Sequence, residues 1–196
     1  MVEDRNVVIV TGIPGVGKTT VINTAVQMVK DERKEEVLIL NIGTEMFELA
    51  SERGFIQDRD ELRKMPTSRQ REIQRLAGEA IAQKAKTGGV IVDTHTLIQT
   101  KNGFLIGLPE WVVKAIQPKT VVLVEADPEK IAGRRTSDET RTRDAQLTEE
   151  IDTHQRMCRA AAVSVGTLTG ATVRIIRNRE GKVEEAASEL AATLME

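Results

Sequence analysis

Residues 12–19 carry the clearest chemical pattern in this sequence, because they fit the spacing G-x-x-x-x-G-K-[ST] at every fixed position. They are Gly12, Ile13, Pro14, Gly15, Val16, Gly17, Lys18 and Thr19. Glycines at these positions let the backbone curl, so that its N–H groups point at a polyphosphate. The lysine would reach the β and γ phosphates, and the threonine hydroxyl would ligate Mg²⁺. We therefore predict a phosphate-binding loop, continued by Thr20 in the next helix.

The residues on either side of this loop support the prediction. The apolar run at 6–11 is typical of a short buried strand, and residues 20–26 favour a helix. A helix N-terminus is positively polarised, so the order strand, loop, helix places it beside a bound anion.

Asp93 is the second residue with a defined chemical use. It ends an apolar run at 90–93, at the carboxyl end of a predicted strand. A carboxylate there would lie near Thr19 and hold Mg²⁺, whereas a buried Asp without a metal or partner would be costly. His95 follows closely. We expect it to support the site through hydrogen bonds rather than to transfer protons, because phosphoryl transfer needs little acid–base help.

Arginines gather between residues 133 and 144, where four of them fall within ten positions and no apolar side chain larger than glycine occurs. The four are Arg134, Arg135, Arg141 and Arg143. Such a run is commonly a solvated surface, but the planar guanidinium matches phosphate oxygens. Given the phosphate-binding loop, we predict a mobile lid over residues 133–145 that neutralises a transferring phosphoryl group.

The elements that carry these residues alternate along the chain. Strands are predicted at 6–11, 37–41, 90–93, 120–126 and 171–176, with helices between them. This pattern predicts a single α/β domain, residues 1–196, built on a doubly wound five-stranded parallel sheet. Ligands of such sheets bind at the carboxyl ends of the strands, so residues 43–45, including Thr44, face a possible site.

Composition excludes several classes of protein. The chain has 196 residues with a net charge of -2, and it contains only 2% aromatic residues and no Tyr. Neither a general polyanion binder nor a stacking surface for nucleic acid is expected. The single Cys158 excludes an intrachain disulfide. No apolar run approaches the roughly 18 residues of a membrane span, and the first residues do not resemble a secretion signal. We expect a cytoplasmic protein without membrane contact.

Several of these motifs occur together, in order, in one known family. They are the loop with Thr20, the stretches 92–95 (Val-Asp-Thr-His) and 107–111 (Gly-Leu-Pro-Glu-Trp), the arginine-rich run 133–144, and 154–162 (His-Gln-Arg-Met-Cys-Arg-Ala-Ala-Ala). Over essentially the full chain this set resembles the archaeal-type adenylate kinases. The resemblance implies transfer of a phosphoryl group from Mg·ATP to AMP giving two ADP, a nucleoside monophosphate-binding region at 43–87, a short lid without zinc, and a homotrimer.

The resemblance also implies roles for single residues. Lys18 and the loop amides would grip the ATP phosphates, and Thr19 and Asp93 would serve Mg²⁺. Arg134 occupies the place of a transition-state arginine. The remaining implied positions are the lid pair Arg141 and Arg143, and the turn from Asn178 to Gly181 beside the adenine of ATP.

The sequence departs from the common bacterial kinases at the AMP site. Glu48 falls near the place of their AMP-phosphate arginine, and the segment 103–109 lacks the arginine that follows their third strand. We therefore expect Arg59 and Arg63, in the polar segment 51–66, to hold the AMP phosphate.

Two alternatives stay open. A kinase acting on another nucleoside monophosphate or small molecule would keep the loop, Asp93 and the lid but change the acceptor site. A GTPase switch is a weaker candidate, because it would need Gly at position 96 and an Asn-Lys-x-Asp motif. Position 96 is Thr, and Asn178 is followed by Arg179.

Overall fold

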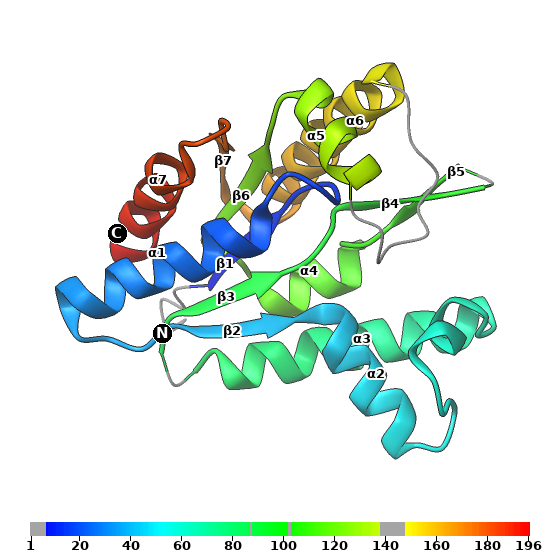
Figure 1. Ribbon diagram of the computed structural model, residues 1–196. Helices are drawn as coiled ribbons and strands as arrows, with labels where there is room; N and C mark the ends of the chain where they lie inside the picture. The colour runs from blue at the N-terminus through cyan, green and yellow to red at the C-terminus, as the bar shows by residue number, and fades with distance from the viewer. Residues whose placement is uncertain (1–6, 87, 102, 138–147) are drawn as a thin grey trace.

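The computed structural model describes residues 7–86, 88–101, 103–137 and 148–196. Its centre is a parallel sheet of five strands in the order β2-β3-β1-β6-β7 (Figure 1). The strands are β1 (Val7–Thr11), β2 (Leu38–Asn41), β3 (Val90–Asp93), β6 (Thr120–Glu125) and β7 (Thr172–Arg177). The predicted five-stranded α/β fold is confirmed, with strand bounds that differ by one residue at several ends.

Alternate side chains of the central strand explain why helices cover both faces of the sheet. Val8 and Val10 of β1 belong to one core cluster, together with side chains of α1 (Lys18–Arg33) and α7 (Val183–Met195). Val7 and Ile9 belong to a second cluster on the opposite face. Both clusters are almost entirely aliphatic, as the composition requires.

The second face of the sheet is covered by three helices. They are α3 (Thr67–Lys84), α4 (Glu110–Ile116) and α6 (Thr148–Thr169). Gly78 of α3 lets this helix approach α4, since an added Cβ would lie 3.3 Å from the Val112 carbonyl oxygen. The shorter α2 (Ile42–Glu52) and α5 (Pro128–Ser137) complete the fold.

Two further short elements lie outside the predicted strands and helices. β4 (Leu97–Thr100) and β5 (Gly103–Ile106) pair as an antiparallel hairpin. It projects from the sheet edge in Figure 1. Within the polar segment 51–66, η1 (Arg59–Arg63) is a 3-10 helix with a capping box formed by Asp58 and Glu61. Both elements are short and partly exposed, so hydrophobic periodicity does not reveal them.

The expected lid lies only partly within the described residues. Residues 133–137 continue α5. The rest of the segment, with Arg141 and Arg143, falls outside the described ranges. Among the helices of the described ranges, none is long and apolar enough to cross a membrane.

Candidate active site

The phosphate-binding loop takes the conformation that its glycines allow. Gly15 and Gly17 have φ angles of 96° and 83°, in the left-handed region that glycine adopts without strain. Gly12 meets a different requirement, because an added Cβ would lie 2.6 Å from the carbonyl oxygen of Val124 in β6. Ile13 and Val16 are buried in the core. Their side chains therefore anchor the loop, which leaves its backbone amides and the start of α1 for an anion.

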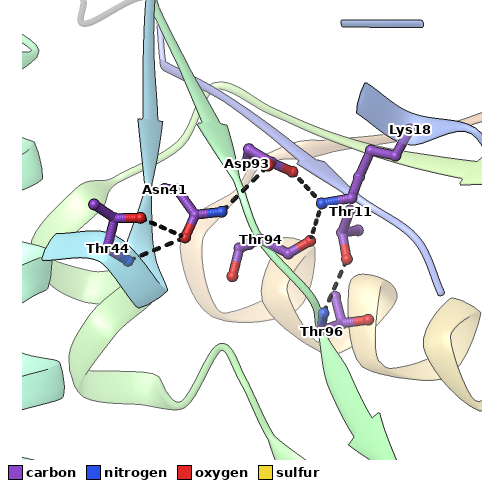
Figure 2. Close-up of polar contacts among 7 residues, drawn as sticks. All are labelled: Thr11, Lys18, Asn41, Thr44, Asp93, Thr94 and Thr96. Atoms are coloured by element: carbon purple, nitrogen blue, oxygen red, sulfur yellow. Dashed lines mark hydrogen bonds and ion pairs between the residues drawn. The ribbon is translucent and has the colours of Figure 1, made fainter. Parts of the chain in front are cut away.

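Lys18, the first residue of α1, lies across the end of β3. Its ammonium group forms an ion pair with the Asp93 carboxylate and donates a hydrogen bond of 3.0 Å to the carbonyl oxygen of Thr94 (Figure 2). Burial lowers the pKa of Lys18 from its ordinary value, and the attraction of Asp93 opposes part of this shift. The charge that would grip phosphates is thus held by an internal carboxylate.

The two predicted magnesium ligands have suitable chemistry. The Thr19 side chain is exposed at the start of α1, and Asp93 ends β3 beside Lys18. Hydroxyl and carboxylate oxygens are hard donors of the kind that Mg²⁺ prefers, with water and phosphate oxygens completing its shell. The donor set therefore fits the ion, and its use by these residues stays a prediction.

Two residues that are distant in sequence hydrogen-bond to backbone carbonyl groups of the loop. Nη1 of Arg134, in α5, donates to the Gly15 carbonyl oxygen at 3.2 Å. Nδ2 of Asn178, which follows β7, donates to the Val16 carbonyl oxygen at 2.7 Å. The Asn178 side chain is buried in this contact and stabilises the loop. The position of the 178–181 turn beside the adenine of ATP stays a prediction.

A cavity of about 290 Å³ opens on the other side of Asp93, between α2, α3 and the β4–β5 hairpin. We call it the α2–α3 cavity. Its wall consists of Asn41, Ile42, Gly43, Met46, Arg59, Asp60, Leu62, Gln70, Gln74, Thr94, His95, Ile98, Leu105, Ile106 and Gly107. The wall combines apolar side chains with a guanidinium, amides, an imidazole and the carboxylate of Asp60. Such a mixture suits a ligand with an anionic end and a planar ring.

One of the predicted acceptor residues, Arg59, belongs to the wall of this cavity, whereas Thr44 does not. Arg59 lines it and donates from Nη2 to the Thr44 hydroxyl at 3.3 Å. Thr44 lies in the first turn of α2. Arg63 ends η1, and its side chain lies outside the described part of the structure. The structure thus brings Arg59 and Thr44 together.

Sequence reasoning missed several polar residues of the cavity wall, namely Asn41, Gln70 and Gln74. Gln70 and Gln74 are four residues apart and share one side of α3, beside the buried Ile73. That spacing is a usable signal, although glutamines on a helix surface are common. His95 also lines the cavity, and its expected support of the site through hydrogen bonds stays a prediction.

Gly107 fixes the hairpin against the end of β3. A Cβ at this position would lie 2.0 Å from the carbonyl oxygen of His95, so no other residue fits without backbone movement. The Gly107 amide donates to the Thr96 carbonyl oxygen at 2.9 Å, and the Thr96 amide donates to the Thr11 hydroxyl at 2.9 Å. The cavity wall is therefore tied to β1 beneath the phosphate-binding loop.

The run 154–162 lies on α6, and three of its side chains attach this helix to neighbouring elements. Buried His154 packs against Phe104 of the hairpin, with ring centroids 5.1 Å apart. Gln155 exchanges two hydrogen bonds with the backbone of Ala126, of 3.1 and 3.0 Å. Arg159 binds the buried Glu125 carboxylate with two bonds of 2.5 and 2.6 Å. These contacts fasten α6 to the carboxyl end of β6.

The fold and the site together define a class of protein. A phosphate-binding loop on a five-stranded parallel sheet, with a second cavity across the β3 end, is the arrangement of a P-loop kinase. A crystal structure of shikimate kinase from Bacteroides thetaiotaomicron has the same fold, with a TM-score of 0.57 and 15% identity over 97% of this chain and 98% of that one.

Sequence comparison narrows the class. A family model described as an AAA domain matches residues 11–152. An adenylate kinase from Methanocaldococcus jannaschii is 48% identical over 190 residues, which are 97% of this chain and 98% of the relative. One from Methanopyrus kandleri is also 48% identical over 190 residues, 96% of this chain and 97% of the relative. The chain therefore belongs to this AAA-domain family and to the adenylate kinase family, and the stated resemblance is confirmed.

Proposed function

We propose that this chain transfers the γ-phosphoryl group of Mg·ATP to AMP. The bond between the γ phosphorus and the β–γ bridging oxygen breaks, a bond from an AMP phosphate oxygen to that phosphorus forms, and two ADP result. One observation carries the proposal beyond family membership: Thr94 accepts the hydrogen bond of Lys18 and also lines the α2–α3 cavity. A donor phosphate at Lys18 and an acceptor in the cavity would thus be neighbours.

On the donor side, the loop amides and Lys18 hold the phosphates of ATP. Lys18 leaves Asp93 for this purpose, because a polyphosphate offers it more negative charge than one carboxylate. Thr19 and Asp93 would hold Mg²⁺, an ion that would supply positive charge against the β and γ phosphates. Arg134 lies beside Gly15 and reaches the transferring group from α5. Preorganised charges of this kind stabilise a transition state without reorganisation at the moment of reaction.

On the acceptor side, Arg59 and Thr44 receive the AMP phosphate, with Arg63 as a further cation in the same 3-10 helix. The apolar side chains Ile98 and Leu105 offer a surface for the base. Region 43–87 is thereby the monophosphate-binding part of the single domain 1–196.

We assign the lid to residues 133–145. Closure by Arg141 and Arg143 would exclude water, so that ATP is not hydrolysed in place of transfer. The homotrimer and the cytoplasmic location implied earlier stay predictions; sedimentation velocity on the purified chain tests the first.

The test of this function is coupled ADP formation from Mg·ATP with AMP, GMP, CMP, UMP or no acceptor. Fast turnover with AMP alone is the expected result. Turnover with another monophosphate would keep the kinase and move the assignment to a different acceptor. ADP formation without any acceptor would contradict the proposed transfer.

A further inference from the structure

Asn41 stands at the junction between the sheet and the α2–α3 cavity. It is the last residue of β2, where it pairs in register with Asp93 of β3. It is also the N-cap residue of α2, the helix whose first turn borders the cavity. One residue therefore belongs both to the rigid sheet and to the acceptor side of the molecule.

The two ends of the Asn41 amide face different sites (Figure 2). Its Nδ2 donates to Oδ2 of Asp93 at 3.2 Å, while Oδ1 of that carboxylate is paired with Lys18. Its Oδ1 accepts from the backbone N–H of Thr44 at 3.1 Å and from the Thr44 hydroxyl at 3.4 Å. The same hydroxyl accepts from Arg59 at 3.3 Å. A continuous line of polar contacts thus joins Arg59 in the cavity to Lys18 at the phosphate-binding loop.

We propose that Asn41 is a positioning residue that couples the two nucleotide sites, so that filling the α2–α3 cavity strengthens binding of ATP. This inference rests on the donor and acceptor sites proposed above. An anionic acceptor gives Arg59 a stronger partner than the Thr44 hydroxyl. Arg59 then leaves Thr44, so the first turn of α2 changes its hydrogen bonds with Asn41. The Asn41 amide moves as a result, and the Asp93 carboxylate that it contacts shifts. The pair with Lys18 weakens, and Lys18 becomes free for phosphate.

Serine at position 41 separates this proposal from a simple structural role. Serine caps a helix about as well as asparagine, because its hydroxyl accepts from the first turn. It has no amide with which to reach Asp93. Asn41→Ser therefore keeps the start of α2 and removes the link to the donor side.

The experiment measures binding rather than turnover. Calorimetry gives the Kd of the magnesium complex of adenosine 5′-(β,γ-imido)triphosphate, a non-hydrolysable ATP analogue, without AMP and with saturating AMP. In the natural chain we expect AMP to tighten analogue binding by about fivefold or more, the lower range of known couplings between sites. In Asn41→Ser we expect this factor to fall below about twofold. The Kd of AMP alone should change less than about threefold, a shift smaller than one lost hydrogen bond to a charged group gives.

Three outcomes overturn the proposal. The first is that AMP binds to the natural chain without changing analogue affinity. The second is that Asn41→Ser retains the full coupling. The third is that this variant loses AMP affinity itself while the coupling persists, which would make Asn41 a direct ligand of the acceptor. Failure of AMP to bind the natural chain at all is a different result, and it contradicts the proposed function instead.

A second substitution covers the case in which serine disturbs the fold. Asn41→Asp keeps the size and the cap but places a carboxylate against Asp93, so coupling should again be lost. Thermal unfolding of both variants, compared with Asn41→Ala, shows whether the cap has survived. Persistence of coupling in Asn41→Asp overturns the proposal in the same way.

Discussion

The donor and acceptor sides of this molecule meet at Thr94, just beyond the end of β3, yet they are built by different means. The phosphate-binding loop is one continuous segment whose backbone amides are the predicted phosphate donors, and its conformation depends on Gly12, Gly15 and Gly17. The α2–α3 cavity is assembled from residues as far apart in sequence as Asn41 and Gly107. We expect the charged groups at the phosphate-binding loop to determine turnover. The side chains of the α2–α3 cavity should determine which acceptor binds. Substitutions on each side test this division.

The largest effect is expected at Lys18. Lys18→Met should lower kcat by about 10³-fold, because it removes the principal fixed positive charge on the transferring phosphates. The midpoint of thermal unfolding should move by only a few degrees, since methionine fills the same buried space. Steady-state kinetics and a thermal melt check the two parts. Lys30→Met, at the exposed end of the same helix, is the matched control and should retain full activity.

Arg134 should rank second. Arg134→Ala should lower kcat by about 10²-fold with little change in stability, as loss of a single preorganised donor does. Arg134→Lys should recover only part of the activity, because an ammonium group lacks the planar fork. Lys130→Ala, one turn earlier on α5, removes an exposed ion pair with Glu180 and serves as control. Equal turnover in Arg134→Ala and in this control would exclude Arg134 from the donor side.

On the acceptor side, Arg59→Ala should raise KM for AMP about tenfold while leaving KM for ATP at saturating AMP unchanged. Loss of a hydrogen bond to a charged group costs about 1.5 to 3 kcal/mol, and the loss falls on one substrate only. Arg53→Ala is a suitable control, since Arg53 contacts the Leu49 carbonyl oxygen on α2 and does not line the cavity. A parallel rise in KM for ATP would contradict the division between the two sides.

The smallest effect belongs to the core, where neither ligand is involved. Burial raises the pKa of the Cys158 thiol above its unfolded value. The folded chain therefore keeps the proton to higher pH than the unfolded chain does. Stability from the neutral thiol is complete below the unfolded pKa, about 8.5, and declines as pH rises toward the folded value. Denaturant titrations at pH 7 and 9.5 should show this decline, and Cys158→Ala should show less of it.

Sequence patterns predicted the sheet and the donor side well, for physical reasons. A phosphate-binding loop demands glycine where φ is positive or a strand passes closely, so its residues are recognisable without coordinates. Buried parallel strands are continuous apolar runs. Asp93 was predicted at the carboxyl end of its strand near Thr19, and the structure pairs it with the neighbouring Lys18. Its use as a magnesium ligand stays a prediction.

The acceptor side was less predictable, because its residues come together only through packing. Arg59 and Thr44 were named in advance, yet Gln70, Gln74 and Asn41 were not. Amide side chains on helices and at strand ends occur throughout proteins, so their types carry little information. The β4–β5 hairpin was missed because its two strands have four residues each and are partly exposed. No local sequence pattern predicts the ion pair between Arg159 and Glu125, which are 34 positions apart.

In the protein without nucleotide, the Asp93 carboxylate competes with any incoming anion for Lys18. Any anion that approaches the loop must displace a carboxylate that is already in place. Inorganic phosphate or sulfate can contact Lys18 and some of the loop amides, but one small anion gains fewer contacts from this displacement than a triphosphate does. A complete triphosphate would contact more of the loop amides, and these contacts would offset the loss of the ion pair. We therefore expect the resting enzyme to bind small anions more weakly than its nucleotide.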